Sequence, residues 1–247
     1  MKLNRKIAII TGAAGGLGTA FTRRFLAEGA RVCATDKTTE GLARLTAELG
    51  PRIELMTVPA DITKEADAEK IYHKIAEAWG YVDILINNAG WFPFSAFEQI
   101  TYEEWKAVIS VNLDGPFLVT KALLPLIKKS TSGRIINIGS GSIYTGTPNQ
   151  THYVSAKAAL LGFTRSLANA LGDYKITVNL VTPGLTVTPN LVKAASPAMI
   201  EEVESNGALK RKQEAEDLVG GVVFLATDDA AFITGQTLNI DGGRTFI

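Results

Sequence analysis

The sequence has little of several features that mark particular classes of protein. Its 25 Lys and Arg balance 25 Asp and Glu, so no basic excess is present for binding nucleic acid. Its one cysteine, Cys33, excludes an intrachain disulfide and favours a reducing, cytoplasmic location. No run approaches the ~18 apolar residues of a membrane span. The apolar stretch 7–10, behind Lys2 and Arg5, is too short for a signal peptide.

The sequence does contain a regular alternation of short apolar segments and longer helical ones. The short segments are apolar and β-branched throughout, which is typical of strands covered on both faces. Repeated strand–helix units predict an α/β fold with one doubly wound parallel sheet and helices on both faces. We expect a single domain over 1–247, a long helix over 102–129 with irregularities at Pro116 and Pro125, and a substrate-binding lid over 184–214. The predicted strands are 7–10, 31–35, 53–58, 83–86, 133–138, 176–181 and 237–240.

The first predicted strand runs into the glycine-rich loop TGAAGGLG, residues 11–18, and then into a helix. Glycines allow a tight turn and bring backbone N–H groups close to a pyrophosphate, which a helix N-terminus also favours. Asp36 closes the second strand, where a carboxylate accepts hydrogen bonds from an adenosine ribose and repels a 2′-phosphate. The neighbouring Lys37 would attract that phosphate. Together the loop and Asp36 predict binding of NAD rather than NADP.

A second motif places Tyr153 and Lys157 four residues apart, on one face of a predicted helix. An ammonium close to a phenol favours the phenolate and lowers its pKa, which suits a general base near neutral pH. Ser140 ends the fifth predicted strand, at the edge of a parallel sheet where ligands bind. With only two histidines and one cysteine, the sequence shows no cluster with metal-ligand spacing, so we expect no metal site.

In combination, these motifs resemble the short-chain dehydrogenase/reductase family over essentially the whole chain. The matching motifs are TGxxxGxG at 11–18, NNAG at 87–90, Asn112, Ser140, YxxxK at 153–157 and PG at 183–184. The resemblance implies a single Rossmann-like domain with a seven-stranded sheet, and a nicotinamide cofactor. It also implies a homotetramer in which long helices of neighbouring subunits pair.

The resemblance further implies a role for each matching residue. Tyr153 is the catalytic acid/base, Lys157 lowers its pKa, Ser140 positions the substrate oxygen and Asn112 holds a water in a proton relay. The residues implied to contact the cofactor are Gly12, Gly16, Leu17, Gly18, Asp36, Asp61, Ile62, Asn88, Gly90, Tyr153, Lys157, Pro183, Gly184, Thr186 and Thr188. Simpler roles stay open for Asp61, as a helix cap, and for Asn88, as a partner of backbone groups.

Aromatic residues follow the NNAG turn, at 91–94. We expect Trp91 and Phe92 to form an apolar wall of the substrate pocket, together with Ser140, Tyr144 and Leu185. No Arg or Lys occurs at the loop positions nearest Ser140, although the predicted lid holds Lys193, Lys210, Arg211 and Lys212. A substrate that carries a carboxylate or a phosphate is therefore not expected.

The function expected from these residues is reversible hydride transfer between NAD and a secondary or cyclic, ring-bearing alcohol or ketone. Segments 151–153 and 162–165 resemble bacterial phenylethanol dehydrogenases, and segments 146–149 and 181–185 resemble pyridoxal 4-dehydrogenase. One alternative is an NADP-dependent 3-oxoacyl-(acyl-carrier-protein) reductase, and another is a dinucleotide-binding regulator without catalysis. The expected partners are a small-molecule substrate and further copies of the chain, with neither nucleic acid nor a membrane.

Overall fold

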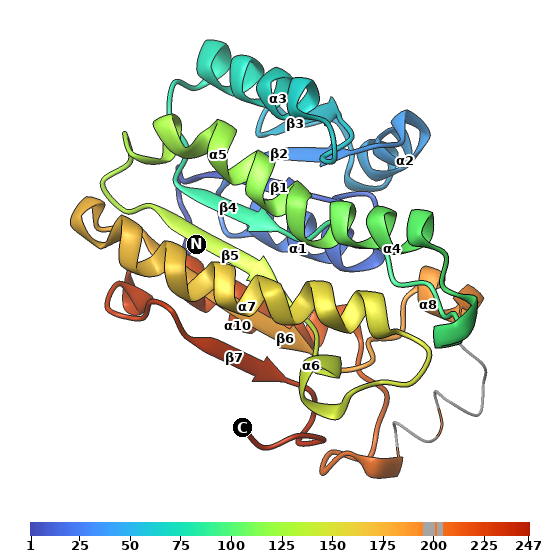
Figure 1. Ribbon diagram of the computed structural model, residues 1–247. Coiled ribbons are helices and arrows are strands. Elements are labelled where there is room, and N and C mark those ends of the chain that lie inside the picture. The colour runs from blue at the N-terminus through green and yellow to red at the C-terminus, as the bar shows by residue number, and fades with distance from the viewer. Residues whose placement is uncertain (195–200, 202–204) are drawn as a thin grey trace.

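The computed structural model describes residues 1–194, 201 and 205–247, which are built around a parallel sheet (Figure 1). Within these residues the sheet has seven strands in the order β3-β2-β1-β4-β5-β6-β7. They are β1 (Ile7–Thr11), β2 (Arg31–Asp36), β3 (Leu55–Pro59), β4 (Ile84–Asn87), β5 (Arg134–Ile138), β6 (Thr177–Pro183) and β7 (Thr237–Ile240). The order reverses between β1 and β4, so the loops after these two strands diverge and leave a crevice. The predicted seven-stranded, doubly wound α/β sheet is confirmed.

Helices cover both faces of the sheet (Figure 1). Ala8 and Ile10 of β1 point to the core beneath α1, α2 and α10, whereas Ile7 and Ile9 point to the core beneath α3, α5 and α7. Both faces are therefore apolar, which explains the continuous apolar strands. The main helices are α1 (Gly16–Ala27), α2 (Thr39–Leu49), α3 (Glu65–Ala78), α4 (Tyr102–Ile109), α5 (Gly115–Ile127), α7 (Thr151–Leu171) and α10 (Ala215–Ala226). Shorter helical segments are η1 (Phe97–Gln99), α6 (Ser142–Thr145), η3 (Gly172–Tyr174), α8 (Pro189–Ala194) and η4 (Asp228–Ala230).

The segment predicted as one helix over 102–129 has three parts. A π-helical turn, η2 (Ser110–Asp114), separates α4 from α5. The irregularity predicted at Pro116 lies next to this turn: Pro116 stands in the first turn of α5, two residues after Asp114, and the residues before it keep helical φ and ψ. Pro125 lies inside α5, which continues to Ile127. The break falls instead around Asn112, and π-helical turns of this kind often mark functional sites.

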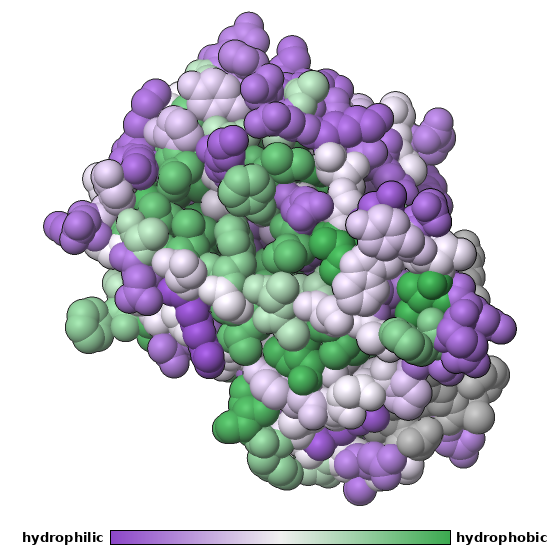
Figure 2. Space-filling model, in the orientation of Figure 1, coloured by the Kyte–Doolittle hydropathy of each residue, from purple (hydrophilic) through white to green (hydrophobic). Residues whose placement is uncertain are grey.

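Across α4, η2 and α5, the span Tyr102–Ile127 is long and apolar enough to cross a membrane by length and composition, the one such span among the described residues. Inside the fold, however, α5 packs on α3, and α4 packs on α7. The outer side of α5 remains partly exposed to solvent, since Phe117 is 47% exposed. Apolar residues gather on the face where α5 and α7 lie (Figure 2). These contacts indicate a core helix with an apolar outer face.

Candidate active site

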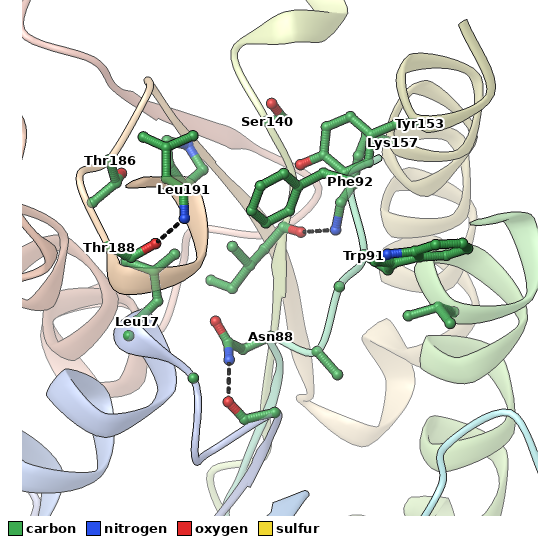
Figure 3. A pocket seen from close by; sticks show the side chains of 18 of the residues that line it. Leu17, Asn88, Trp91, Phe92, Ser140, Tyr153, Lys157, Thr186, Thr188 and Leu191 are labelled. Atoms are coloured by element: carbon green, nitrogen blue, oxygen red, sulfur yellow. Dashed lines mark hydrogen bonds between the residues drawn. The ribbon is translucent and has the colours of Figure 1, made fainter. Parts of the chain in front are cut away.

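A cavity of about 860 Å³ opens along the carboxyl ends of the strands. It extends from Asp36, at the end of β2, past the crevice between β1 and β4, to Pro183 at the end of β6 and Asp241 just after β7. The residues predicted to contact the cofactor all line it, namely Gly12, Gly16, Leu17, Gly18, Asp36, Asp61, Ile62, Asn88, Gly90, Tyr153, Lys157, Pro183, Gly184, Thr186 and Thr188. Figure 3 shows that Leu17 and Asn88 lie on one side and Ser140 and Tyr153 on the other.

The glycine-rich loop joins β1 to the N-terminus of α1. Gly12 has φ +62°, and a Cβ on Gly18 would lie 2.1 Å from the carbonyl oxygen of Gly12. Only glycines allow the backbone to close on itself so tightly. No side chain caps α1, and its first turn holds no acidic residue, so its first N–H groups are left for a ligand. This cradle fits the pyrophosphate of a dinucleotide.

Asp36 is held at one end of the cavity by three protein groups. Its carboxylate accepts hydrogen bonds from Ala14 N (3.2 Å), Thr38 N (3.1 Å) and the Thr38 hydroxyl (2.9 Å). Lone pairs remain for a ribose hydroxyl, since a carboxylate has about four acceptor sites. Lys37 and Arg44 line the same end of the cavity. The end of β2 therefore combines a fixed anion with two nearby cations.

The simpler role left open for Asn88 is present, but that of Asp61 as a helix cap is not, because α3 begins at Glu65 with Lys64 as its N-cap and no side chain caps it. Asp61 Oδ1 accepts hydrogen bonds from the backbone N–H (3.1 Å) and hydroxyl (2.7 Å) of Thr63. The Asn88 amide donates to Thr11 O at 2.8 Å and to Gly12 O at 3.2 Å. Asn88 thus ties the loop after β4 to the glycine-rich loop after β1. Both residues also line the cavity, so these structural roles leave room for cofactor contacts.

Ser140, Tyr153 and Lys157 come together at the end of β5. Lys157 Nζ donates to Ile138 O at 2.8 Å and lies 5.8 Å from the centre of the Tyr153 ring (Figure 3). Ser140 Oγ accepts hydrogen bonds from Ser142 N (3.2 Å) and from the Ser142 hydroxyl (2.8 Å). The hydrogen of the Ser140 hydroxyl is therefore left to point at Tyr153 or at a substrate oxygen.

Burial dominates the proton affinities of this group. It raises the pKa of Tyr153 to about 12, and a hydrogen bond with Ser140 opposes the rise. It also lowers the pKa of Lys157 to about 8. Desolvation penalises both charged forms, and the expectation that Lys157 depresses the pKa of Tyr153 stays a prediction. At neutral pH Tyr153 is a phenol that can donate a proton.

Asn112 does not line the cavity. Its amide donates to Trp91 O (2.7 Å) and Val108 O (2.9 Å), and its oxygen accepts from Trp91 N (3.3 Å). The side chain is fully buried and binds the backbone of the loop that carries the aromatic wall. A Cβ on Gly90 would lie 3.1 Å from Asn112 Oδ1 and 3.6 Å from Lys157 Nζ, so both polar groups lie beside the backbone of Gly90. A water relay through Asn112 stays a prediction.

The aromatic wall is present, with one exception. Trp91, Phe92, Ser140 and Leu185 line the cavity. The Phe92 ring packs edge-on against Tyr153, with ring centres 6.2 Å apart (Figure 3). The prediction for Tyr144 is wrong, because this residue lies outside the cavity lining. The short helix α6 that carries Tyr144 presents Thr145 to the cavity instead.

His152 lies next to Tyr153 and is fully buried outside the cavity. Its Nδ1 accepts from Tyr153 N at 2.9 Å, so its Nε2 carries the proton that faces Glu104 at 3.0 Å. Ser95 donates to the same Glu104 oxygen at 2.6 Å, and these hydrogen bonds hold the pKa of Glu104 below its usual value. This chain of contacts links the first turn of α7 to α4 and to the aromatic loop. The sequence motifs give no sign of it.

The predicted lid over 184–214 is described in part. Leu185, Thr186 and Thr188 line the cavity, and the Thr188 hydroxyl accepts from Leu191 N at 3.3 Å at the start of α8 (Figure 3). Val187 N donates to Gln213 O at 2.8 Å, which joins the two ends of the segment. The parts 195–200 and 202–204 lie outside the described residues.

Sequence reasoning missed several residues that line the cavity. Gln150 donates to Phe92 O at 3.3 Å from the start of α7, and Asp241, Arg244 and Thr245 reach the cavity from beyond β7. The last three stand far from Ser140 in the chain, and no motif marks them. Within the described residues, no group of three His, Cys, Asp or Glu is placed to hold a metal ion.

Comparisons with known proteins identify relatives of this chain by sequence. Residues 12–245 match a protein-family model described as enoyl-(acyl carrier protein) reductase. The chain is 36% identical to a 3-oxoacyl-(acyl-carrier-protein) reductase of Thermotoga maritima over 244 residues, which cover 98% of this chain and 99% of the relative. It is also 36% identical to the protein of the same name from Escherichia coli, over the full length of both.

A solved structure gives the same result for the fold. The chain superposes with a TM-score of 0.94 on a crystal structure of a short-chain dehydrogenase/reductase of the glucose/ribitol dehydrogenase type from Brucella melitensis. The two are 32% identical, and the match covers 100% of this chain and 99% of the other. Both the sequence and the fold therefore have counterparts in the same group of proteins.

Proposed function

Because the chain belongs to the short-chain dehydrogenase/reductase family and is an oxidoreductase, we propose that it uses NADH to reduce the ketone of a 3-oxoacyl compound to a secondary alcohol. Two 36% identical relatives named as 3-oxoacyl reductases favour this substrate over the ring-bearing alcohol expected from the sequence. The observation that carries the chemistry is the convergence of Ser140, Tyr153 and Lys157 beside a cradle that fits a dinucleotide.

The residues at the end of β5 can hold and protonate a carbonyl oxygen. The Ser140 hydroxyl, whose oxygen accepts two hydrogen bonds from Ser142, donates its own hydrogen to that oxygen. A bound nicotinamide supplies the hydride. Tyr153 gives its phenolic proton to the oxygen as negative charge develops there, and its pKa of about 12 keeps that proton available at neutral pH. A protonated Lys157 favours the phenolate that remains.

The proposed preference for NADH rests on Asp36. Its carboxylate is fixed by Ala14 and Thr38 at the end of β2, where it can accept hydrogen bonds from a ribose and repel a 2′-phosphate. Lys37 and Arg44 line the same end and weaken that repulsion. Initial rates with NADH and NADPH under equal conditions test this part, and a strong preference for NADPH would overturn it.

A ring-bearing ketone remains a second candidate because of the cavity wall. Trp91, Phe92 and Phe94 line the cavity, and the Phe92 ring lies against Tyr153. Aromatic side chains offer a large apolar surface to a ring. Oxidation of NADH measured with 3-oxobutanoyl thioesters and with aryl and cyclic ketones separates the two candidates.

The variant Tyr153→Phe tests the assigned chemistry. It removes the proton donor and keeps the ring that packs on Phe92, so we expect turnover to fall by about 10²- to 10⁴-fold with NADH binding retained. Tyr144→Phe removes the hydroxyl of a tyrosine outside the cavity lining and is the matched control. Turnover of Tyr153→Phe close to that of the wild type would overturn the assignment.

Self-association is part of the proposal. The apolar face that includes the exposed Phe117 on α5 fits pairing with another copy, as in the expected homotetramer. Light scattering of the purified protein tests this, and a particle of 26.4 kDa would contradict it.

A further inference from the structure

We propose that Arg244 binds an anionic group of the substrate, so that the enzyme prefers ketones with a carboxylate or a phosphate. This inference rests on the proposed function and adds a binding subsite at the far end of the cavity. It reverses the expectation from the sequence that no cation stands near Ser140. The fold brings Arg244 to the cavity from the end of the chain.

The position of Arg244 follows from the order of the strands. The dinucleotide cradle and Asp36 lie after β1 and β2, and Ser140 lies after β5. Beyond β5 come β6 and β7, and Arg244 follows β7, two strand spacings or about 10 Å from β5. Backbone contacts step across this edge, from Gly141 N to Pro183 O at 2.7 Å and from Gly184 N to Ile240 O at 3.1 Å. A cofactor that extends from Asp36 to the segment just after β6 leaves the cavity wall beyond β7, where Arg244 lies, for the substrate.

The guanidinium of Arg244 is available for a ligand. Arg244 is partly buried and makes no side-chain hydrogen bond or ion pair with any residue that the structure describes. Arg211 pairs with both oxygens of Asp217 and Arg134 pairs with Asp228, whereas Arg244 and Arg44, both in the cavity lining, have no such partner among the described residues. An arginine beside a cavity with its planar fork free is suited to bidentate binding of a carboxylate or a phosphate.

The turn that carries Arg244 is fixed by hydrogen bonds. Asp241 Oδ1 accepts from Gly243 N at 3.0 Å and from Arg244 N at 3.1 Å. Leu209 N donates to the carbonyl of Gly242 at 2.8 Å. Gly242 and Gly243 have φ +67° and +74°, a conformation that glycine adopts without strain. The backbone at Arg244 is therefore fixed before a ligand arrives, which lowers the entropic cost of ordering this segment on binding.

Asp241 is the one acidic residue among the described cavity residues at this end, and it does not neutralise Arg244 by contact. One carboxylate oxygen fixes the turn, and the other is buried without a hydrogen-bond partner. No ion pair within 4.0 Å joins the two residues, although they are three positions apart. The carboxylate thus holds the backbone of the turn and leaves the guanidinium for another anion.

The test compares ketones that differ only in charge. One pair is 3-oxobutanoate and its ethyl ester, and the other is 3-oxobutanoyl-4′-phosphopantetheine and the same thioester without the phosphate. Kinetics with NADH are measured for the wild type, Arg244→Met and Arg244→Lys. Arg165→Met, which removes an exposed arginine of α7 outside the cavity, is the matched control.

We expect the wild type to prefer the charged member of at least one pair, and the pair concerned identifies carboxylate or phosphate. In Arg244→Met the KM for that member should rise about 10- to 100-fold, with the neutral member changed less than about two-fold. Arg244→Lys should recover part of the loss, because it keeps the charge and loses the fork. Arg165→Met should behave as the wild type does.

Two outcomes would overturn the inference: equal use of both members of each pair by the wild type, or an equal effect of Arg244→Met on both members. Failure of the proposed function looks different, since none of the four ketones would then be reduced although NADH binds. In that case calorimetric titration of 3-oxobutanoate into the protein with NADH still tests the subsite. Equal binding by the wild type and Arg244→Met would count against it.

Discussion

The two ends of the cavity each contain an aspartate and an arginine, but they differ in which polar groups remain available to a ligand. At the end of β2, Asp36 stands with Arg44, and beyond β7, Asp241 stands with Arg244. Each carboxylate accepts hydrogen bonds from backbone N–H groups, and each arginine lacks a partner among the described side chains. Asp36 keeps lone pairs for a ribose, whereas the second oxygen of Asp241 is buried. An aspartate and an arginine can therefore form two different kinds of site. Where the aspartate keeps free lone pairs it favours a sugar hydroxyl, and where the aspartate is used up in holding the backbone the arginine favours an anion.

The largest expected effect is the loss of cofactor binding at the end of the cavity that contains the glycine-rich loop. Gly18→Ala places a Cβ 2.1 Å from Gly12 O and 2.6 Å from the Cα of Ala13, so the backbone of the loop must move. We expect the affinity for NADH, measured by fluorescence titration, to fall by about 100-fold or more. The control Gly220→Ala, on the exposed side of α10, meets no atom within 4 Å and should stabilise the protein by about 0.5–1 kcal/mol. NADH binding by Gly18→Ala as tight as that of the wild type would contradict the cradle.

The next prediction removes the anion from the first end and leaves its cations. In Asp36→Asn, Lys37 and Arg44 no longer face a carboxylate, so the ratio of kcat/KM for NADH to that for NADPH should fall about 10- to 100-fold. Asp61→Asn is the control, because that carboxylate lines the same end but accepts hydrogen bonds from Thr63. An unchanged ratio in Asp36→Asn would mean that Asp36 does not distinguish the ribose of NADH from the 2′-phosphorylated ribose of NADPH.

A third prediction concerns the centre between the two ends. Burial lowers the pKa of Lys157 from its usual 10.5 to about 8, so the folded protein binds fewer protons than the unfolded chain between these values. Stability should therefore rise from pH 8 to pH 10, by on the order of 1–3 kcal/mol. The raised pKa of Tyr153 acts in the opposite direction only above pH 10. Thermal melts of the wild type without cofactor measure this rise.

Lys157→Met is the control for that rise. It should flatten the pH dependence between pH 8 and pH 10 and raise the melting temperature at pH 7, while abolishing turnover. A melting temperature below that of the wild type at pH 7 would show that Lys157 stabilises the fold rather than serving the chemistry.

The smallest expected effect is on the KM for the ketone and shows which aromatic residues contact the substrate. Phe92→Ala removes a ring that lines the cavity against Tyr153, and we expect the KM for the ketone to change by about 10-fold. Tyr144→Ala, one short helix away, should leave the KM within about two-fold of the wild type. A larger effect of Tyr144→Ala than of Phe92→Ala would mean that α6 moves into the cavity when substrate binds.

The same comparison explains how much the sequence could predict. The first end is continuous in the chain, since a strand, the loop 11–18, a helix and the strand end at Asp36 follow one another, and local backbone rules are enough. Tyr153 and Lys157 also follow from helical spacing. Arg244 and Gln150 could not be predicted, because they reach the cavity through the order of β5, β6 and β7 and through the turn before α7. The pKa values of Tyr153 and Lys157 depend on burial, which spacing does not reveal.

The geometry around Asn112 depends on how many residues the π-helical turn Ser110–Asp114 contains. A π turn holds one residue more than an α-turn, so deleting one residue there would let α4 and α5 join as a regular helix. Five residues in the wider π turn and four residues in an α-helix rotate through about the same angle, so α5 would keep its register on α3 and α4 its register on α7. The change would be confined to the backbone around Asn112, where the extra residue widens the helix. Asn112 would then turn away from the backbone of Trp91, so the number of residues in this turn matters as much as their identity.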